Sequence, residues 1–158
     1  MSRTDQAGRT PALQAIIDFF EGICPADIAR IGEIYSPQAW FKDPFNEVRG
    51  SAAIGRIFSH MFEQVRDPRF VVHDCVGGER EVFLTWDFIF QRTGGATLTV
   101  RGASHLRLDD QGRIEWHRDY WDTGEELYGK LPLIGPLMRW LRRQGAAPAA
   151  GSIDTIER

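Results

Sequence analysis

The sequence predicts an α+β domain in which helices come first and a sheet follows. Two patterns predict this class. Apolar residues recur at helical spacing in three segments before residue 66, and from residue 69 onward they alternate with a period of two. The chain has 158 residues, of which 42% are hydrophobic and 26% are charged, as is typical of one globular domain that forms its own core.

Capping and turn residues set the limits of the first two expected helices. Thr10 caps the first helix, Pro11 occupies its first turn, and the helix ends near Gly22. A second helix opens at Pro25, and its apolar stripe runs to Tyr35.

A short strand and a third helix are expected next. The segment AWFKD is aromatic and is followed by Pro44, which predicts a strand that ends in a turn. Gly50 and Ser51 begin a helix with a regular apolar stripe, and Asp67–Pro68 ends it.

Four long alternating segments, joined by short turns, predict an antiparallel meander. They cover residues 69–76, 81–92, 96–108 and 113–122. In the second of these strands, Trp86 and Phe88 are expected to face inward with Asp87 outside. In the third, Ser104 shares an inward face with Leu106, which places a hydroxyl on an otherwise apolar wall.

The last strand, EWHRDYWD at residues 115–122, carries the candidate chemistry. Alternation places His117, Asp119 and Trp121 on one face, and Trp116, Arg118, Tyr120 and Asp122 on the other. An imidazole and a carboxylate two positions apart on one strand can approach each other, and an aspartate that holds a histidine is half of many acid–base devices. The alternative is that His117 and Asp119 stabilise the strand or bind a ligand without catalysing a reaction.

Several classes of function are not expected. The net charge of −3 provides no basic field for nucleic acid. The sequence has no Gly-rich phosphate loop, GxSxG or CxxC motif and no metal-ligand spacing of histidines, so neither a cofactor nor a metal is expected. The first ten residues are polar and no apolar run approaches membrane-spanning length, which favours a cytoplasmic location.

The order of elements, together with the motifs FKDPF…RGSAAI and WHRDYWD, resembles the nuclear transport factor 2-like superfamily. Its enzymes include ketosteroid isomerases, SnoaL-like polyketide cyclases and limonene epoxide hydrolases. The resemblance covers residues 10–128. It implies a cone-shaped, curved antiparallel sheet that wraps around three helices and encloses a pocket. It also implies an apolar small-molecule ligand and a homodimer.

The first motif resembles the isomerase segment that carries the proton-transferring aspartate, and Asp43 matches that base. Phe19 and Ser104 stand where the isomerases carry a tyrosine and a protonated aspartate that stabilise the dienolate. Phenylalanine donates no hydrogen bond, so steroid isomerisation by that route is not expected. Asp43 has the alternative role of capping the turn at Pro44.

The second motif resembles the WRDYFD pattern of limonene epoxide hydrolases. Asp119 matches the aspartate that helps to activate water, while Trp86 and Phe88 stand in place of its arginine and aspartate partners. Both motifs imply that His117, Asp119 and Trp121 face the pocket.

We therefore expect a cofactor-free acid–base enzyme of the isomerase, cyclase, dehydratase or hydrolase type, with Asp43, His117 and Asp119 as catalytic residues. The alternative is a non-catalytic domain of the same fold that binds a small molecule or a protein. The expected ligand-binding residues are mainly aromatic: Phe19, Phe41, Phe45, Trp86, Phe88, Ser104, Leu106 and Trp121.

The C-terminal part is expected to lie outside this domain. Residues 129–144 predict an amphipathic helical extension, and residues 145–158 predict a disordered tail. We expect the extension to pack over its own barrel or over a partner subunit. The alternative is contact with an anionic membrane surface, because arginines and a tryptophan accompany its apolar residues.

Overall fold

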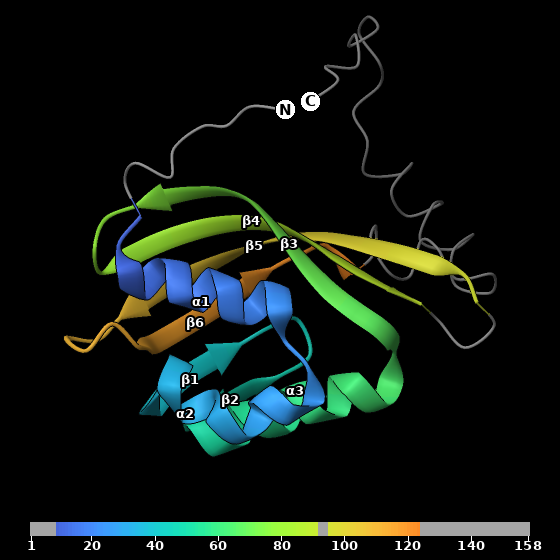
Figure 1. Cartoon of the computed structure of the whole chain (residues 1–158), viewed down its shortest axis with the longest axis horizontal. Helices are drawn as coiled ribbons and strands as arrows, with labels where there is room; N and C mark the ends of the chain where they lie inside the picture. The colour runs from blue at the N-terminus through green and yellow to red at the C-terminus, as the bar shows by residue number, and fades with distance from the viewer. Residues whose placement is uncertain (1–8, 92–94, 124–158) are drawn as a thin grey trace, which may run out of the picture. The chain divides into compact units, whose positions relative to one another are not determined.

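The computed structural model describes residues 9–91 and 95–123, and the predicted C-terminal extension and tail lie outside them. The described residues up to Asp122 form one unit by their internal contacts. The helices precede most of the sheet, as the sequence predicts (Figure 1). They are α1 (Pro11–Gly22), the 3-10 helix η2 (Pro25–Arg30), α2 (Ile31–Ile34) and α3 (Ser51–Gln64).

Six strands form a single sheet in the order β2-β1-β6-β5-β4-β3. They are β1 (Tyr35–Lys42), β2 (Glu47–Arg49), β3 (Arg66–Gly77), β4 (Glu81–Gln91), β5 (Thr97–Leu108) and β6 (Ile114–Tyr120). The predicted meander from β3 to β6 is antiparallel throughout, which confirms the α+β class. However, β1 pairs with β6 in parallel, so the sheet is mixed and the expectation of a wholly antiparallel sheet is wrong.

Two boundaries differ from the prediction. Tyr35 is the first residue of β1 and not the last residue of a helix, and its side chain is completely buried. The third helix ends at Gln64, so Asp67–Pro68 lies inside β3 instead of closing the helix. Pro68 fits there because β3 is one of the two edge strands of the sheet, where a strand tolerates a missing donor.

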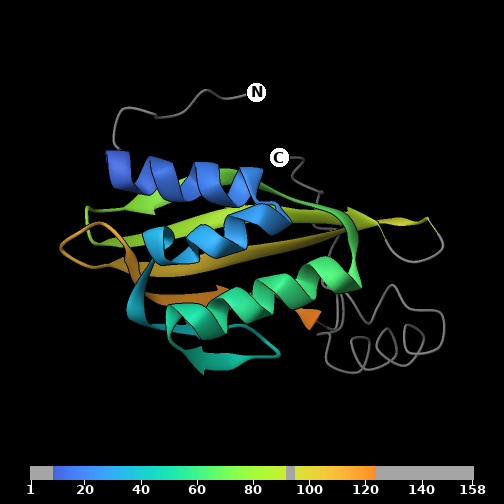
Figure 2. The same ribbon diagram turned by 60° about the horizontal axis from the view of Figure 1, so that its bottom comes forward.

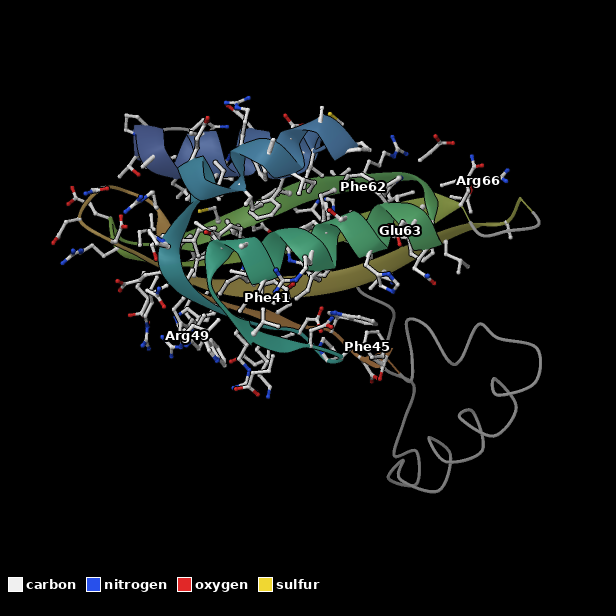
Figure 3. All side chains as sticks on the ribbon, turned by 90° about the horizontal axis from the view of Figure 1, so that it is seen from below. Phe41, Phe45, Arg49, Phe62, Glu63 and Arg66 are labelled. Carbon is white, nitrogen blue, oxygen red and sulfur yellow. The ribbon has the colours of Figure 1, made fainter. Side chains whose placement is uncertain are left out.

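The helices cover one face of the curved sheet, and the core lies between them (Figure 2). The expected stripe of α1 is buried: Leu13, Ile16, Ile17 and Phe20. Figure 3 shows α3 across the sheet, with Phe41 beside it and Phe45 near the end of β6. No helix among the described residues is both long enough and apolar enough to span a membrane.

Candidate functional site

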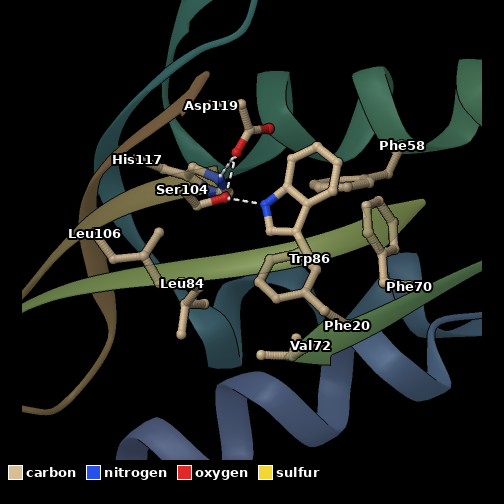
Figure 4. Close-up of a pocket in the computed structure, with 10 residues that line it drawn as sticks. All are labelled: Phe20, Phe58, Phe70, Val72, Leu84, Trp86, Ser104, Leu106, His117 and Asp119. Atoms are coloured by element: carbon tan, nitrogen blue, oxygen red, sulfur yellow. Dashed lines mark hydrogen bonds and ion pairs between the residues drawn. The ribbon is translucent and has the colours of Figure 1, made fainter. Parts of the chain in front are cut away.

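A cavity of about 30 Å³ lies between the helices and the concave face of the sheet. Its lining combines aromatic and aliphatic side chains with three polar ones (Figure 4). The lining residues are Phe20, Phe58, Phe70, Val72, Leu84, Trp86, Ser104, Leu106, His117 and Asp119. We call this space the inner cavity.

The register of β5 and β6 brings the polar side chains together. Ser104 is directly opposite Asp119, and Leu106 is directly opposite His117. Ser104 donates a hydrogen bond of 2.5 Å to Oδ1 of Asp119. Nε2 of His117 lies 2.7 Å from the same carboxylate oxygen. One oxygen of Asp119 is therefore held from two sides.

Tyr35 orients His117 through the ring nitrogen that does not contact Asp119. Its hydroxyl oxygen lies 2.6 Å from Nδ1 of His117, and the two rings stack at 5.9 Å. Burial, and secondly the charge of Asp119, raise the pKa of Tyr35 well above 10.0, so the phenol keeps its proton. The phenol donates to Nδ1, because no other acceptor for its proton is found among the described residues. Nε2 of His117 then carries the ring proton and donates it to Asp119.

Trp86 completes the hydrogen-bond network from β4. Its indole Nε1 donates to Oγ of Ser104 at 2.8 Å. The indole lies over Gly102, its direct partner in β5, where an added Cβ would meet the ring at 2.3 Å. Because glycine has no side chain, the indole of Trp86 can occupy this space, and its hydrogen bond to Ser104 holds it there.

Asp43 lies in a different setting. Its Oδ1 accepts hydrogen bonds from the backbone N–H groups of Phe45, at 2.7 Å, and of Asn46, at 2.6 Å. The carboxylate thus caps the turn between β1 and β2, as the structural alternative predicts. Asp43 does not line the inner cavity. It lines a broad outer hollow together with Asp119, which is shared by both spaces.

The structure divides the predicted site residues into three groups. Those that line the inner cavity are Trp86, Ser104, Leu106, His117 and Asp119. Asp43 and Trp121 line the outer hollow, where the ring of the exposed Phe45 stands edge-on to Trp121 at 5.4 Å. Phe19, Phe41 and Phe88 line neither space: Phe41 packs against His117 at 4.9 Å, Phe88 stacks on Phe70 at 4.6 Å, and Phe19 lies half-buried on α1.

The sequence contained signals for some residues that the prediction of the site omitted. Phe20 lines the cavity where the resemblance pointed to Phe19, and the helical spacing of Leu13, Ile16 and Ile17 already placed Phe20 inward. Tyr35 had no such signal, because its spacing from Ile31 also fits a helix.

The arrangement can transfer a proton. Oδ2 of Asp119 has no hydrogen-bond partner among the described residues, and the side chain is 18% exposed. A carboxylate so held presents one free oxygen to a ligand. Within the described part of the chain, no group of three or more histidine, cysteine or acidic side chains is arranged to hold a metal ion.

Comparison with known families identifies the fold. Residues 16–117 match the SnoaL-like domain family, which is more than half of the chain. The chain belongs to the SnoaL-like domain family. The matched SnoaL-like region includes Tyr35, Trp86, Ser104 and His117, and it ends two residues before Asp119. No curated protein matches the chain.

Solved structures share the SnoaL-like fold at low sequence identity. A protein with a ketosteroid isomerase-like fold from Catenulispora acidiphila, in complex with trimethylamine, is 16% identical with a TM-score of 0.64, covering 75% of this chain and 92% of its own. TerC, co-crystallised with polyporic acid, is 19% identical with a TM-score of 0.63. The match covers 72% of this chain and 93% of the TerC chain. An epoxide hydrolase from M. tuberculosis, similar to limonene epoxide hydrolase, is 17% identical with a TM-score of 0.61. The match covers 84% of this chain and 93% of the hydrolase chain.

Proposed function

We propose that this SnoaL-like protein is a cofactor-free acid–base enzyme in which Asp119 accepts or returns a proton and His117 holds it in position. The observation that carries the proposal is the state of the Asp119 carboxylate. One of its oxygens is fixed by Ser104 and His117, while the other has no hydrogen-bond partner among the described residues. Fixed carboxylates of this kind act as general bases on a bound ligand or water.

The size of the inner cavity restricts the substrate. Ligand pockets for drug-sized molecules usually enclose about 300–1,000 Å³. The inner cavity has about 30 Å³, so it holds a water or the small reacting end of a ligand. Because Asp119 also lines the outer hollow, the rest of the ligand can extend there. Asp43, whose carboxylate closes a turn, then supports the wall of the outer hollow and does not transfer the proton.

Two assays test the assignment: deuterium exchange from heavy water into the α-carbons of small ketones, and hydrolysis of small epoxides. Asp119→Asn keeps the shape of the side chain and is expected to lower the rate on the order of 100-fold. Asp43→Asn is the matched control and is expected to keep most of the activity. An Asp119→Asn enzyme as fast as the wild type would rule out Asp119 as the base.

The second candidate function is binding without catalysis. Two structural neighbours were crystallised with small molecules, trimethylamine and polyporic acid, which supports a small-molecule ligand whether or not a reaction follows. Ligand binding that depends on Asp119, with no turnover in either assay, would favour this candidate.

We also propose that the outer face of the sheet joins two copies of the chain. The outer face is defined by Val76, Phe83, Trp116 and Tyr120, which point away from the helices. Val76, Phe83 and Tyr120 are 70%, 50% and 46% exposed. Such a group of exposed apolar side chains favours a protein interface. Phe83→Glu is expected to turn dimers into monomers in analytical ultracentrifugation, and a monomeric wild type would contradict the proposal.

A further inference from the structure

The inner cavity offers a ligand no free hydrogen-bond donor from its lining side chains (Figure 4). Trp86, Ser104 and His117 are the lining residues whose side chains carry a polar hydrogen. The indole of Trp86 donates to Ser104, and the hydroxyl of Ser104 donates to Oδ1 of Asp119. The two ring nitrogens of His117 are occupied by Tyr35 and Asp119. Every polar hydrogen of these three side chains is therefore used within the network.

The same network leaves one hydrogen-bond acceptor free. Ser104 and His117 both donate to Oδ1 of Asp119, and Oδ2 of this carboxylate has no hydrogen-bond partner among the described residues. A carboxylate oxygen without a donor beside apolar side chains raises the free energy of the folded protein. A ligand that donates a hydrogen bond to Oδ2 offsets that cost.

The cationic side chains of the outer hollow do not use this acceptor. Nζ of Lys42 lies 2.5 Å from Oε2 of Glu47, and the guanidinium of Arg118 packs over the ring of Tyr120 at 4.8 Å. Among the described residues, no hydrogen bond or ion pair joins Lys42 or Arg118 to Asp119. Within this part of the chain, a donor for Oδ2 therefore has to come from water or from a ligand.

We propose that Asp119 selects ligands that place a hydroxyl group in the inner cavity. The volume of about 30 Å³ holds a group the size of one water molecule, and a hydroxyl group has this size. A hydroxyl group donates to Oδ2, whereas a carbonyl or nitrile group would turn its lone pairs toward the carboxylate and find no donor in the lining. The inference rests on the proposed function, because it names a substrate class for the same site: alcohols whose remaining atoms extend into the outer hollow.

Titration of the full chain with n-butanol and with butyronitrile tests the proposal. The two probes have straight chains of equal length, but the first ends in a hydroxyl donor and the second in a nitrogen that only accepts. The indole N–H signal of Trp86 in nitrogen-15 NMR reports on the inner cavity. Trp40 and Trp116, whose rings stack on each other at 5.0 Å and do not line the cavity, serve as internal references. We expect a saturable shift of the Trp86 signal with n-butanol, and binding at least about tenfold weaker for butyronitrile.

Asp119→Asn is expected to remove this preference. Because Ser104 and His117 both donate to one position, the amide oxygen of the asparagine takes that position and its NH2 group takes the place of Oδ2. The free acceptor thus becomes a free donor at constant shape. A nitrile nitrogen and a hydroxyl oxygen can both accept from this group, so the ratio of the two affinities should fall to about threefold or less.

Two further variants locate the effect. Ser104→Ala frees the indole N–H of Trp86, which then supplies the cavity with a donor, so the preference for n-butanol over butyronitrile should again become smaller. Asp87→Asn is the matched control, since this carboxylate lies on the same sheet beside His73 and does not line the cavity. It should keep the ratio of the wild type.

Equal affinity for the two probes in the wild type, or a preference for butyronitrile, would overturn the proposal. An unchanged ratio in Asp119→Asn, or no saturable shift with either probe, would overturn it as well. If Asp119→Asn does not fold, the ratio in Ser104→Ala decides. Selective binding of n-butanol without turnover in either assay contradicts only the enzyme assignment, whereas turnover that depends on Asp119 without a preference for n-butanol contradicts only the ligand class.

Discussion

Tyr35 shows how a residue outside the cavity can orient the side chains that line it. Its hydroxyl is bonded to Nδ1 of His117, and Nε2 of the same ring contacts one oxygen of Asp119. Because the tyrosine is completely buried, its hydroxyl cannot bond to water and needs this bond to His117. Removing the hydroxyl while keeping the ring isolates that contribution.

Tyr35→Phe is expected to cost about 1–2 kcal/mol near neutral pH, because Nδ1 of His117 loses its buried donor. The native pKa of Tyr35 is raised well above 10.0, so the folded protein holds this proton after the unfolded chain has released it. The stabilisation is complete below about pH 10 and is lost as the pH rises further. Urea unfolding at neutral and alkaline pH should show this loss in the wild type and less of it in Tyr35→Phe.

Tyr120→Phe is the matched control for that measurement, because Tyr120 is 46% exposed on the outer face. It should leave the alkaline loss of stability unchanged. Equal pH dependence in Tyr35→Phe and the wild type would contradict the raised pKa of Tyr35.

Gly102 is predicted to determine the position of Trp86. In Gly102→Ala, the new Cβ would lie 2.3 Å from the indole, so the ring must move and its bond to Ser104 breaks. We expect a loss of about 1–3 kcal/mol in the free energy of unfolding and a shifted Trp86 indole N–H signal. Gly22→Ala is the control, because nothing lies within 4 Å of its added Cβ, and it should be neutral or slightly stabilising. An unmoved Trp86 signal would contradict the role of Gly102.

At the scale of elements, the N-cap residue Thr10 determines where α1 begins. Oγ1 of Thr10 accepts from the backbone N–H of Leu13 at 3.2 Å, and Pro11 follows the cap. Thr10→Ala is expected to lower the free energy of unfolding by about 1 kcal/mol, and Thr10→Ser to lower it little, since serine can accept the same bond. Thermal unfolding of both variants provides the comparison. An Ala variant as stable as the wild type would mean that the cap contributes nothing.

Local signals in the sequence predict the elements whose partners are near in sequence. The cap at Thr10, the stripe of α1 and the turns that precede β4 and β6 are all local, and all appear where expected. The parallel pairing of β1 with β6 joins segments about 75 residues apart, and no periodicity encodes a partner at that distance. Local spacing alone therefore predicts Tyr35 as the end of a helix.

The candidate site was predictable to a similar degree. Alternation placed His117 and Asp119 on one side of β6, but the mixed character of both sides left the inward side open. The family resemblance, and not the period, supplied the choice. Ser104 was predicted from its apolar neighbours, whereas its bond to Asp119 follows from a strand register that the sequence does not state.

At the scale of the whole molecule, the sheet separates two kinds of surface. Its concave face carries the inner cavity, and its outer face carries exposed apolar side chains. Phe83 stacks on His105 at 4.1 Å and Trp116 on Trp40 at 5.0 Å, so aromatic contacts cross four strands there. The two functions proposed for these faces, ligand binding and self-association, can therefore be tested separately.

A shortened chain that ends at Lys130 tests whether the residues up to Asp122 are enough to form both the concave face and the outer face of the sheet. Every buried apolar residue of the described core lies between Leu13 and Ile114, and the exposed group on the outer face ends at Tyr120. We therefore expect the shortened chain to unfold cooperatively and to form the same dimers in analytical ultracentrifugation as the full chain. Phe83→Glu in the shortened chain should again give monomers. Loss of dimers on shortening, with folding intact, would instead assign the interface to the segment after Lys130 and remove the outer face from the proposal.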